Sequence, residues 1–302
     1  MRVLVTGATG MIGTAVCDAL LARGDEVVGL SRDPERARTA NPAIEWHAWH
    51  ATLERPPAEA VEGVEGVVNL IGEPINQRWT EDAKRRIRES RETATRNLVA
   101  SIGAAERPPR VLVSQSGISY YGDTGDTEVD EEAPPGESFD ARLCVAWEAA
   151  AHEAANAGVR VVVVRTAPVV GKGGGLLKSL LPPFRLGVGG PIASGKQYMP
   201  WVHLDDDVGV HLWALDSDQV ESAVNAVSPE PLTNREFSKT LGRVLHRPAV
   251  MPVPKLALSA LYGGELAEML TGGQRAVPRR TRALGYEFRH PELEEALRAA
   301  LA

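Results

Sequence analysis

The chain has 302 residues, of which 43% are hydrophobic and 24% charged, which is typical of a globular protein. A net charge of −7 without a clustered basic patch argues against nucleic acid as the main partner, and no apolar run is long enough to span a membrane. Cys17 and Cys144 lie far apart and form no metal or redox motif. The N-terminus reads as a core strand and not as a signal peptide, so we expect a cytoplasmic protein.

The first thirteen residues carry the clearest functional signal. Four residues suited to a buried strand run into glycines at positions 7, 10 and 13, and an apolar-periodic helix follows to about Arg23. Glycines at such a turn allow the tight bend, the approach of backbone to a pyrophosphate, and close packing of helix on strand. The N–H groups that begin the helix then face phosphate. This context predicts a dinucleotide site.

The end of the second predicted strand, residues 26–32, bears on the choice of cofactor. An acidic residue there binds the free ribose hydroxyls of NAD, whereas Ser31 and Arg32 offer a hydroxyl and a guanidinium that suit the 2′-phosphate of NADP. Asp33 follows directly, so the outcome depends on which side chain points inward. We predict NADP over NAD.

Further apolar strands alternate with helices, which predicts an α/β fold with a doubly wound parallel Rossmann sheet. His47 and His50 fall on opposite faces of one of these strands, so we expect no metal site there. The predicted strands cover 44–50, 66–72, 110–117 and 160–166, with helices over 80–105 and 139–157 and a surface loop over 123–137. Arg91 is expected to point inward at phosphate.

The fifth strand ends in hydroxyl groups. Ser116, Tyr120 and Tyr121 could bracket a substrate carbonyl or alcohol, although a polar strand end with tyrosines capping the core is the alternative.

Beyond residue 171 the chain changes character. A glycine-rich segment over 173–195 is expected to form loops at the nicotinamide end, and the three aspartates over 205–207 are expected to cap a helix. Helices are predicted over 233–245, over 253–270 as one or two, and over 291–301. We therefore divide the chain into a Rossmann core, 1–170, and a smaller, mostly helical substrate-side region, 171–302, interleaved with it.

Motifs along nearly the whole chain resemble the epimerase family proteins of the extended or atypical short-chain dehydrogenase/reductase superfamily. They include the segments 6–13, 69–75, 89–91, 120–122, 147–150, 165–171, 183–187, 200–206, 272–278 and 284–288. The resemblance implies an NADP-binding Rossmann domain with a small C-terminal tail domain. It implies these cofactor contacts: Gly7, Thr9, Gly10, Met11, Ile12 and Gly13 around the pyrophosphate, Ser31 and Arg32 at the 2′-phosphate, Leu70, Ile71 and Gly72 on the adenosine side, Val169 at the nicotinamide end, and Arg91 near the phosphates.

One departure from the superfamily affects the chemistry. Its Tyr-x-x-x-Lys pair, an acid/base with a lysine that lowers its pKa, falls at about Phe139 or Asp140 and at Cys144, and no lysine occurs between Lys84 and Lys172. The substitutes to weigh are Ser116, Tyr120, Tyr121 and His203.

Two functions remain open from the sequence. One is an NADP-dependent oxidoreductase or epimerase acting on a small or sugar-like molecule. The other is a non-catalytic NADP(H)-binding regulatory or scaffold protein, which the missing pair favours. Related proteins pair through the helices at 80–105 and 139–157, so a homodimer is also left open.

Overall fold

The computed structural model describes residues 1–302, which are built around a seven-stranded sheet in which every neighbouring pair is parallel. Its strands, in spatial order, are β3 (Glu45–Ala48), β2 (Glu26–Ser31), β1 (Arg2–Thr6), β4 (Gly66–Asn69), β5 (Val111–Gly117), β7 (Arg160–Thr166) and β10 (Ser222–Ala226). The chain runs outward from β1 to β3, then returns to build the other half from β4. The doubly wound Rossmann fold is therefore confirmed, with its switch point between β1 and β4.

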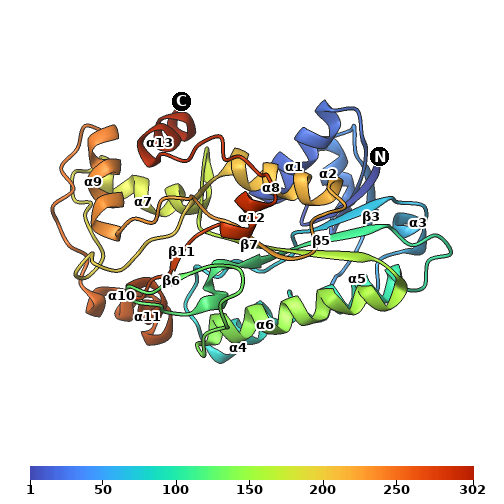
Figure 1. Cartoon of the computed structure of the whole chain (residues 1–302), viewed down its shortest axis with the longest axis horizontal. Coiled ribbons are helices and arrows are strands. Elements are labelled where there is room, and N and C mark those ends of the chain that lie inside the picture. The colour runs from blue at the N-terminus through green and yellow to red at the C-terminus, as the bar shows by residue number, and fades with distance from the viewer.

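Successive side chains along each strand point to opposite faces of the sheet, so each face has its own apolar core. Val3 and Val5 pack into one core and Leu4 into the other. The first core is covered by α1 (Met11–Ala22), α2 (Pro34–Ala40) and α8 (Leu204–Asp216). The second is covered by α3 (Ala58–Val61), α5 (Glu92–Ile102) and α6 (Phe139–His152), which continues as the 3₁₀ helix η2 (Glu153–Ala157). Figure 1 shows these two helical layers on opposite sides of the sheet.

Two elements in the first half of the chain end earlier than expected. The helical stretch predicted over 80–105 is divided into α4 (Glu81–Glu89) and α5, which are separated at Ser90 and Arg91. The strand expected over 66–72 stops at Asn69, and residues 70–72 leave the sheet as an extended segment. Both changes move residues to the carboxyl edge of the sheet, where the predicted cofactor residues lie.

The C-terminal region has a separate apolar core, formed by α7 (Gly175–Arg185), α9 (Asn234–Val244) and α13 (Leu293–Leu301). The prediction of loops over 173–195 is wrong for α7, because Leu177 and Phe184, two turns apart, bury their side chains in this core. The helix predicted from Thr233 is confirmed, and Thr233 and Glu236 form a capping box at its start.

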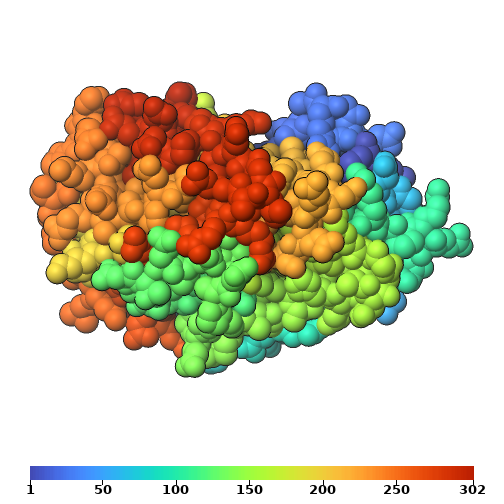
Figure 2. Space-filling view, viewed as in Figure 1, coloured from blue at the N-terminus to red at the C-terminus, as the bar shows by residue number.

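Small elements join this region to the sheet. They are β8 (Val169–Gly171) paired with β9 (Val202–His203), β6 (Glu128–Val129) paired with β11 (Arg275–Ala276), η1 (Ile118–Tyr121), and the helices α10 (Lys255–Tyr262), α11 (Gly264–Thr271) and α12 (Arg279–Ala283). In Figure 2 the C-terminal residues in orange and red abut the green segment that contains β6. No helix is long and apolar enough to cross a membrane.

Candidate functional site

The turn between β1 and α1 has a geometry that only glycine fits. Gly7 has φ +64°, and a Cβ atom there would lie 2.6 Å from the carbonyl oxygen of Leu70. A Cβ at Gly13 would lie 2.2 Å from the carbonyl oxygen of Gly7, so α1 packs directly on the turn. At Gly10, which begins α1, no side chain caps the helix. The first N–H groups of α1 are therefore available to an anion at the switch point of the sheet.

Residues around this turn differ in exposure. Thr9 and Gly10 are exposed, whereas Met11 and Ile12 are half-buried. A Cβ at Gly174 would lie 2.4 Å from Sδ of Met11, so the glycine-rich segment after β8 closes against the start of α1. The two glycine motifs thus form opposite sides of one site.

At the end of β2, Arg32 is the side chain left free for a ligand. The Ser31 hydroxyl donates to the carbonyl of Asp33 and accepts from its N–H, both at 3.1 Å. The Asp33 carboxylate caps α2 by accepting the N–H of Arg36 at 3.1 Å. Arg32 is exposed and makes no hydrogen bond or ion pair. Because the acidic group is engaged and the guanidinium is free, this strand end suits an extra phosphate better than a bare ribose.

The edge of β4 is supported by a buried polar layer. The Thr6 hydroxyl donates to Asn69 Oδ1 at 2.7 Å, and Asn69 Nδ2 donates to Ser114 at 3.0 Å and to Thr95 at 3.1 Å. These bonds tie β1, β4, β5 and α5 together immediately below the edge, so the segment 70–72 is held firmly against Gly7.

The predicted serine at the end of β5 is bound to other side chains. Ser116 is buried and donates to Glu148 Oε1 at 2.7 Å. Glu148 in turn accepts both arms of Arg165, with Nε to Oε1 and Nη2 to Oε2 each at 2.9 Å. Both charged side chains are less than a tenth exposed. A hydroxyl that already donates to a carboxylate is poorly placed to donate to a substrate oxygen.

The two tyrosines differ in the same respect. The Tyr121 hydroxyl donates to Asn225 at 2.9 Å and accepts from Arg165 Nη1 at 3.1 Å, and burial raises the pKa of this phenol to about 12. Tyr120 is half-buried, its hydroxyl has no hydrogen-bond partner, and its ring lies 3.4 Å from the Arg165 guanidinium carbon. Of the two phenols, Tyr120 is the one free to meet a substrate.

His203 is buried where β9 meets α8. Its Nδ1 accepts the N–H of Asp205 at 3.2 Å and thereby caps α8, a role that had been predicted for the aspartates. Burial, and then the neighbouring ring of His290 at 4.0 Å, lower the pKa of His203. These contacts describe a neutral histidine at a helix terminus. Val169, on β8, is buried and pairs with β9 beside it.

A polar cavity of about 590 Å³ opens between α6 and the C-terminal helices. Its wall includes Trp79, Phe139, Asp140, Arg142 and Lys255. Asp140 is buried, and burial raises the pKa of its carboxyl group. This is one of the two positions at which the superfamily tyrosine was expected, so a titratable group does face a ligand-sized space there.

A family model described as the NAD dependent epimerase/dehydratase family matches residues 3–226. The chain belongs to this family. A second model, a domain of unknown function designated DUF1731, matches residues 253–300. Within the family, the human "Epimerase family protein SDR39U1" is 40% identical over all of both chains, and the Bacillus subtilis "Epimerase family protein YfhF" is 30% identical over all of this chain and 98% of that one.

Solved structures agree with this family assignment. The crystal structure of the human SDR39U1 protein with NADPH aligns with a TM-score of 0.89 at 39% identity, over 99% of each chain. A UDP-glucuronic acid 4-epimerase from Bacillus cereus in complex with NAD aligns with a TM-score of 0.79 at 18% identity, over 99% of this chain and 95% of that one, which shows a shared fold.

Sequence reasoning missed the charged residues that this member of the family buries at the strand ends. Glu131, from the segment expected to be a surface loop, is buried and accepts the N–H groups of Arg280, Thr281 and Asn225. Arg165 carried a signal, because it is a charged residue inside an otherwise apolar strand. Nothing local marked its partner Glu148.

Proposed function

We propose that this chain binds NADP(H) and acts as an oxidoreductase or epimerase of short-chain dehydrogenase type on a small, polyhydroxylated substrate. The observation that carries the cofactor part is the uncapped start of α1 at the Gly7 turn, with a free Arg32 on the neighbouring strand. The first holds a pyrophosphate and the second favours a 2′-phosphate. The NADPH in the human relative's crystal structure supports the same choice.

The substrate part rests on the cavity beside α6. Its volume of about 590 Å³ lies within the usual range for small-molecule sites, and only three of its fourteen lining residues are hydrophobic. Trp79 and Phe139 meet edge to face at 5.1 Å on its wall, which offers apolar surface among hydrogen-bonding groups. Such a lining suits a sugar-like ligand. When bound, the cofactor would supply or accept hydride, and the protein would hold the reacting oxygen and its proton.

Two groups are placed to handle that proton. Tyr120 has a free hydroxyl beside the Arg165 guanidinium, and Asp140 faces the cavity with a carboxyl pKa raised by burial. Ser116 and Tyr121 would act by holding the Glu148–Arg165 pair beside Tyr120, since their hydroxyls already have partners.

The alternative, an NADP(H)-binding regulatory or scaffold protein, is favoured by one observation. The position of the superfamily lysine is Cys144, whose thiol is buried and whose pKa is raised by that burial. The lysine that would support a phenolate is therefore missing from its place on α6.

Titration with NADPH and NADH, followed by cofactor fluorescence, tests the cofactor claim. We expect tight NADPH binding, and Arg32→Ala should weaken NADPH by about 10- to 100-fold, the loss of one or two charged hydrogen bonds, while barely changing NADH. Arg107→Ala is the matched control, because Arg107 is exposed and pairs with Glu62. It precedes β5 and therefore lies at the amino ends of the strands, away from the predicted cofactor site at their carboxyl ends. Equal affinities for the two cofactors would contradict the assignment of NADP.

Absorbance at the nicotinamide band, with NADP⁺ and a panel of sugars and sugar nucleotides, tests turnover. An oxidoreductase should reduce NADP⁺ with at least one class. An epimerase returns the hydride to its substrate and leaves no net reduced cofactor, so it should instead yield an epimerised product, read by nuclear magnetic resonance. Tyr120→Phe or Asp140→Asn should abolish either signal with cofactor affinity intact. Tight NADPH binding with neither reduced cofactor nor an epimerised product across the panel would favour the scaffold.

A further inference from the structure

Arg91 is an inward-pointing cation at the break between α4 and α5. Ser90 ends α4, and its hydroxyl accepts the N–H of Glu73 at 2.9 Å and donates to the Ile87 carbonyl at 3.0 Å. Arg91 Nη1 then donates to the Glu73 carbonyl at 3.0 Å and to the Ile87 carbonyl at 3.3 Å. Both bonds hold the guanidinium toward the segment that leaves β4.

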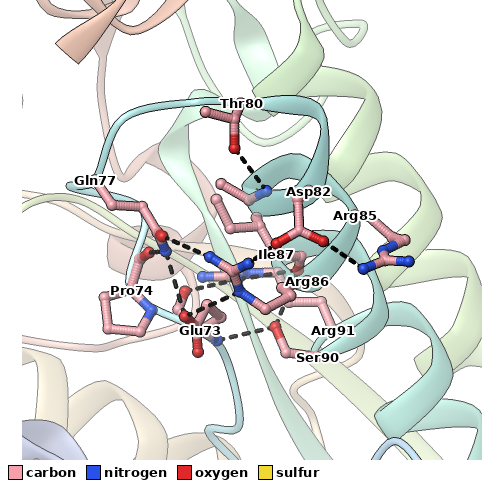
Figure 3. Close-up of polar contacts among 11 residues, drawn as sticks. Glu73, Pro74, Gln77, Thr80, Asp82, Arg85, Arg86, Ile87, Ser90 and Arg91 are labelled. Atoms are coloured by element: carbon pink, nitrogen blue, oxygen red, sulfur yellow. Dashed lines mark hydrogen bonds and ion pairs between the residues drawn. The ribbon is translucent and has the colours of Figure 1, made fainter.

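Arg91 forms no ion pair, and the carboxylate of Glu73 acts on its charge only from beyond ion-pair distance. Figure 3 shows the contrast with its neighbours: Asp82 pairs with both Arg85 and Arg86, whereas Arg91 bonds only backbone carbonyls. Burial lowers the pKa of Arg91 to about 10, so the fold bears a cost for holding it there. Its Nε and Nη2 groups make no hydrogen bond and are not sealed from solvent. A partly buried arginine with free donors and no paired carboxylate is typical of a site that receives oxygen atoms from a ligand.

The surroundings place this guanidinium at the predicted cofactor site. A Cβ at Gly72 would lie 3.0 Å from its central carbon, and Gly72 is two residues beyond the Leu70 carbonyl that contacts Gly7. The guanidinium also lies 5.0 Å from the Trp147 ring on α6, the helix that carries Cys144. Cys144 is where the resemblance leads one to expect a lysine, and it lies one turn before Trp147.

We propose that Arg91 is a cofactor-positioning residue that supplies, from the α4–α5 break, the cation absent at position 144. It would donate from Nε and Nη2 to oxygen atoms of the nicotinamide-ribose half of the dinucleotide. Arg32 would serve the adenosine half from the other side of the switch point. This inference rests on the proposed NADP(H) site. It differs from two expectations of the resemblance: that Arg91 contacts the phosphates generally, and that Gly72, which lies beside the guanidinium, belongs to the adenosine side.

Two ligands distinguish protein contacts to the nicotinamide half of the cofactor from contacts to the adenosine half. NADPH contains both halves, whereas 2′,5′-ADP contains only the adenosine half with its 2′- and 5′-phosphates. Calorimetric titration of the full chain should show that Arg91→Met weakens NADPH by about 10- to 100-fold and leaves 2′,5′-ADP within about twofold. Arg32→Ala should weaken both ligands. Arg91→Lys should restore part of the NADPH affinity, since it restores the charge without the forked geometry.

Arg86→Met is the matched control, because Arg86 lies on the outer side of the same break and pairs with Asp82. It should leave both affinities unchanged. An equal loss of both ligands in Arg91→Met, or no loss of either, would overturn the assignment to the nicotinamide half. If Arg91→Met unfolds, Arg91→Gln, which keeps a polar side chain of smaller size, is measured in its place. Failure of the unmodified chain to bind either ligand would instead refute the NADP(H) site itself.

Discussion

Replacing Glu148 by glutamine should destabilise the protein more than any exposed ion-pair change of the same kind. The side chains of Arg165 and Glu148 are 5% and 9% exposed and form two hydrogen bonds of 2.9 Å. Glutamine has nearly the same shape, but it leaves the Arg165 charge buried without compensation. Breaking a buried pair from one side costs about 3–5 kcal/mol.

The expected shift in melting temperature follows from the chain length. Unfolding entropy of about 2.1 cal/mol/K per residue gives roughly 0.6 kcal/mol/K for a chain of this size, so the loss corresponds to about 5–8 °C. Circular dichroism of the cofactor-free protein at pH 7.5 would measure it. The cofactor is left out because ligand binding adds its own stabilisation.

Glu153→Gln is the control, because Glu153 lies just after the same helix and pairs with Arg96 where both side chains are about half exposed. It should lower the melting temperature by less than about 2 °C, since exposed pairs contribute at most about 1 kcal/mol. A Glu148→Leu, Arg165→Met double variant should recover most of the loss, because it removes both buried charges. A Glu148→Gln shift no larger than that of Glu153→Gln would refute the reasoning.

Three further changes have definite outcomes. Gly13→Ala should abolish NADPH binding and lower stability by about 1–3 kcal/mol, because its Cβ would lie 2.2 Å from the Gly7 carbonyl oxygen. The fold lowers the pKa of His203, so the stability gained from its neutral form is complete above about pH 6.5 and is lost as pH falls through the folded pKa. Urea titrations at pH 7.5 and 5.0 would measure this loss of unfolding free energy. The loss should be smaller in His290→Asn, which removes the neighbouring charge. Native Cys144 should resist iodoacetamide at pH 8, since burial raises its pKa, and should react fully in urea, as read by mass spectrometry.

The glycine and histidine predictions each have a matched control variant. Gly103→Ala should be benign, because its Cβ would come no closer than 3.5 Å to any atom. His246→Asn should leave the pH dependence unchanged, because His246 is exposed and far along the chain from the histidine pair. Cofactor binding by Gly13→Ala, equal acid sensitivity of His290→Asn and the unaltered chain, or rapid labelling of native Cys144 would each contradict the corresponding argument.

The sequence by itself determined the features that depend on near neighbours. A strand followed by glycines at 7, 10 and 13 can only turn tightly into a helix, and apolar runs separated by amphipathic helices can only form a parallel sheet covered on both faces. The Thr233 cap was likewise readable, because the residues that form it are three apart. These patterns are local, so backbone geometry alone sets their outcome.

Tertiary structure decided which polar groups remain free. The register of β5 against β7 places Ser116 opposite Arg165, and packing of α6 on those strands brings Glu148 between them, so the serine donates to a carboxylate. The direction of the Arg91 side chain is another such outcome, because its guanidinium donates to the carbonyl of Glu73, eighteen residues earlier. Side-chain partners far apart in the sequence are chosen by how strands and helices pack, and no local period encodes that choice.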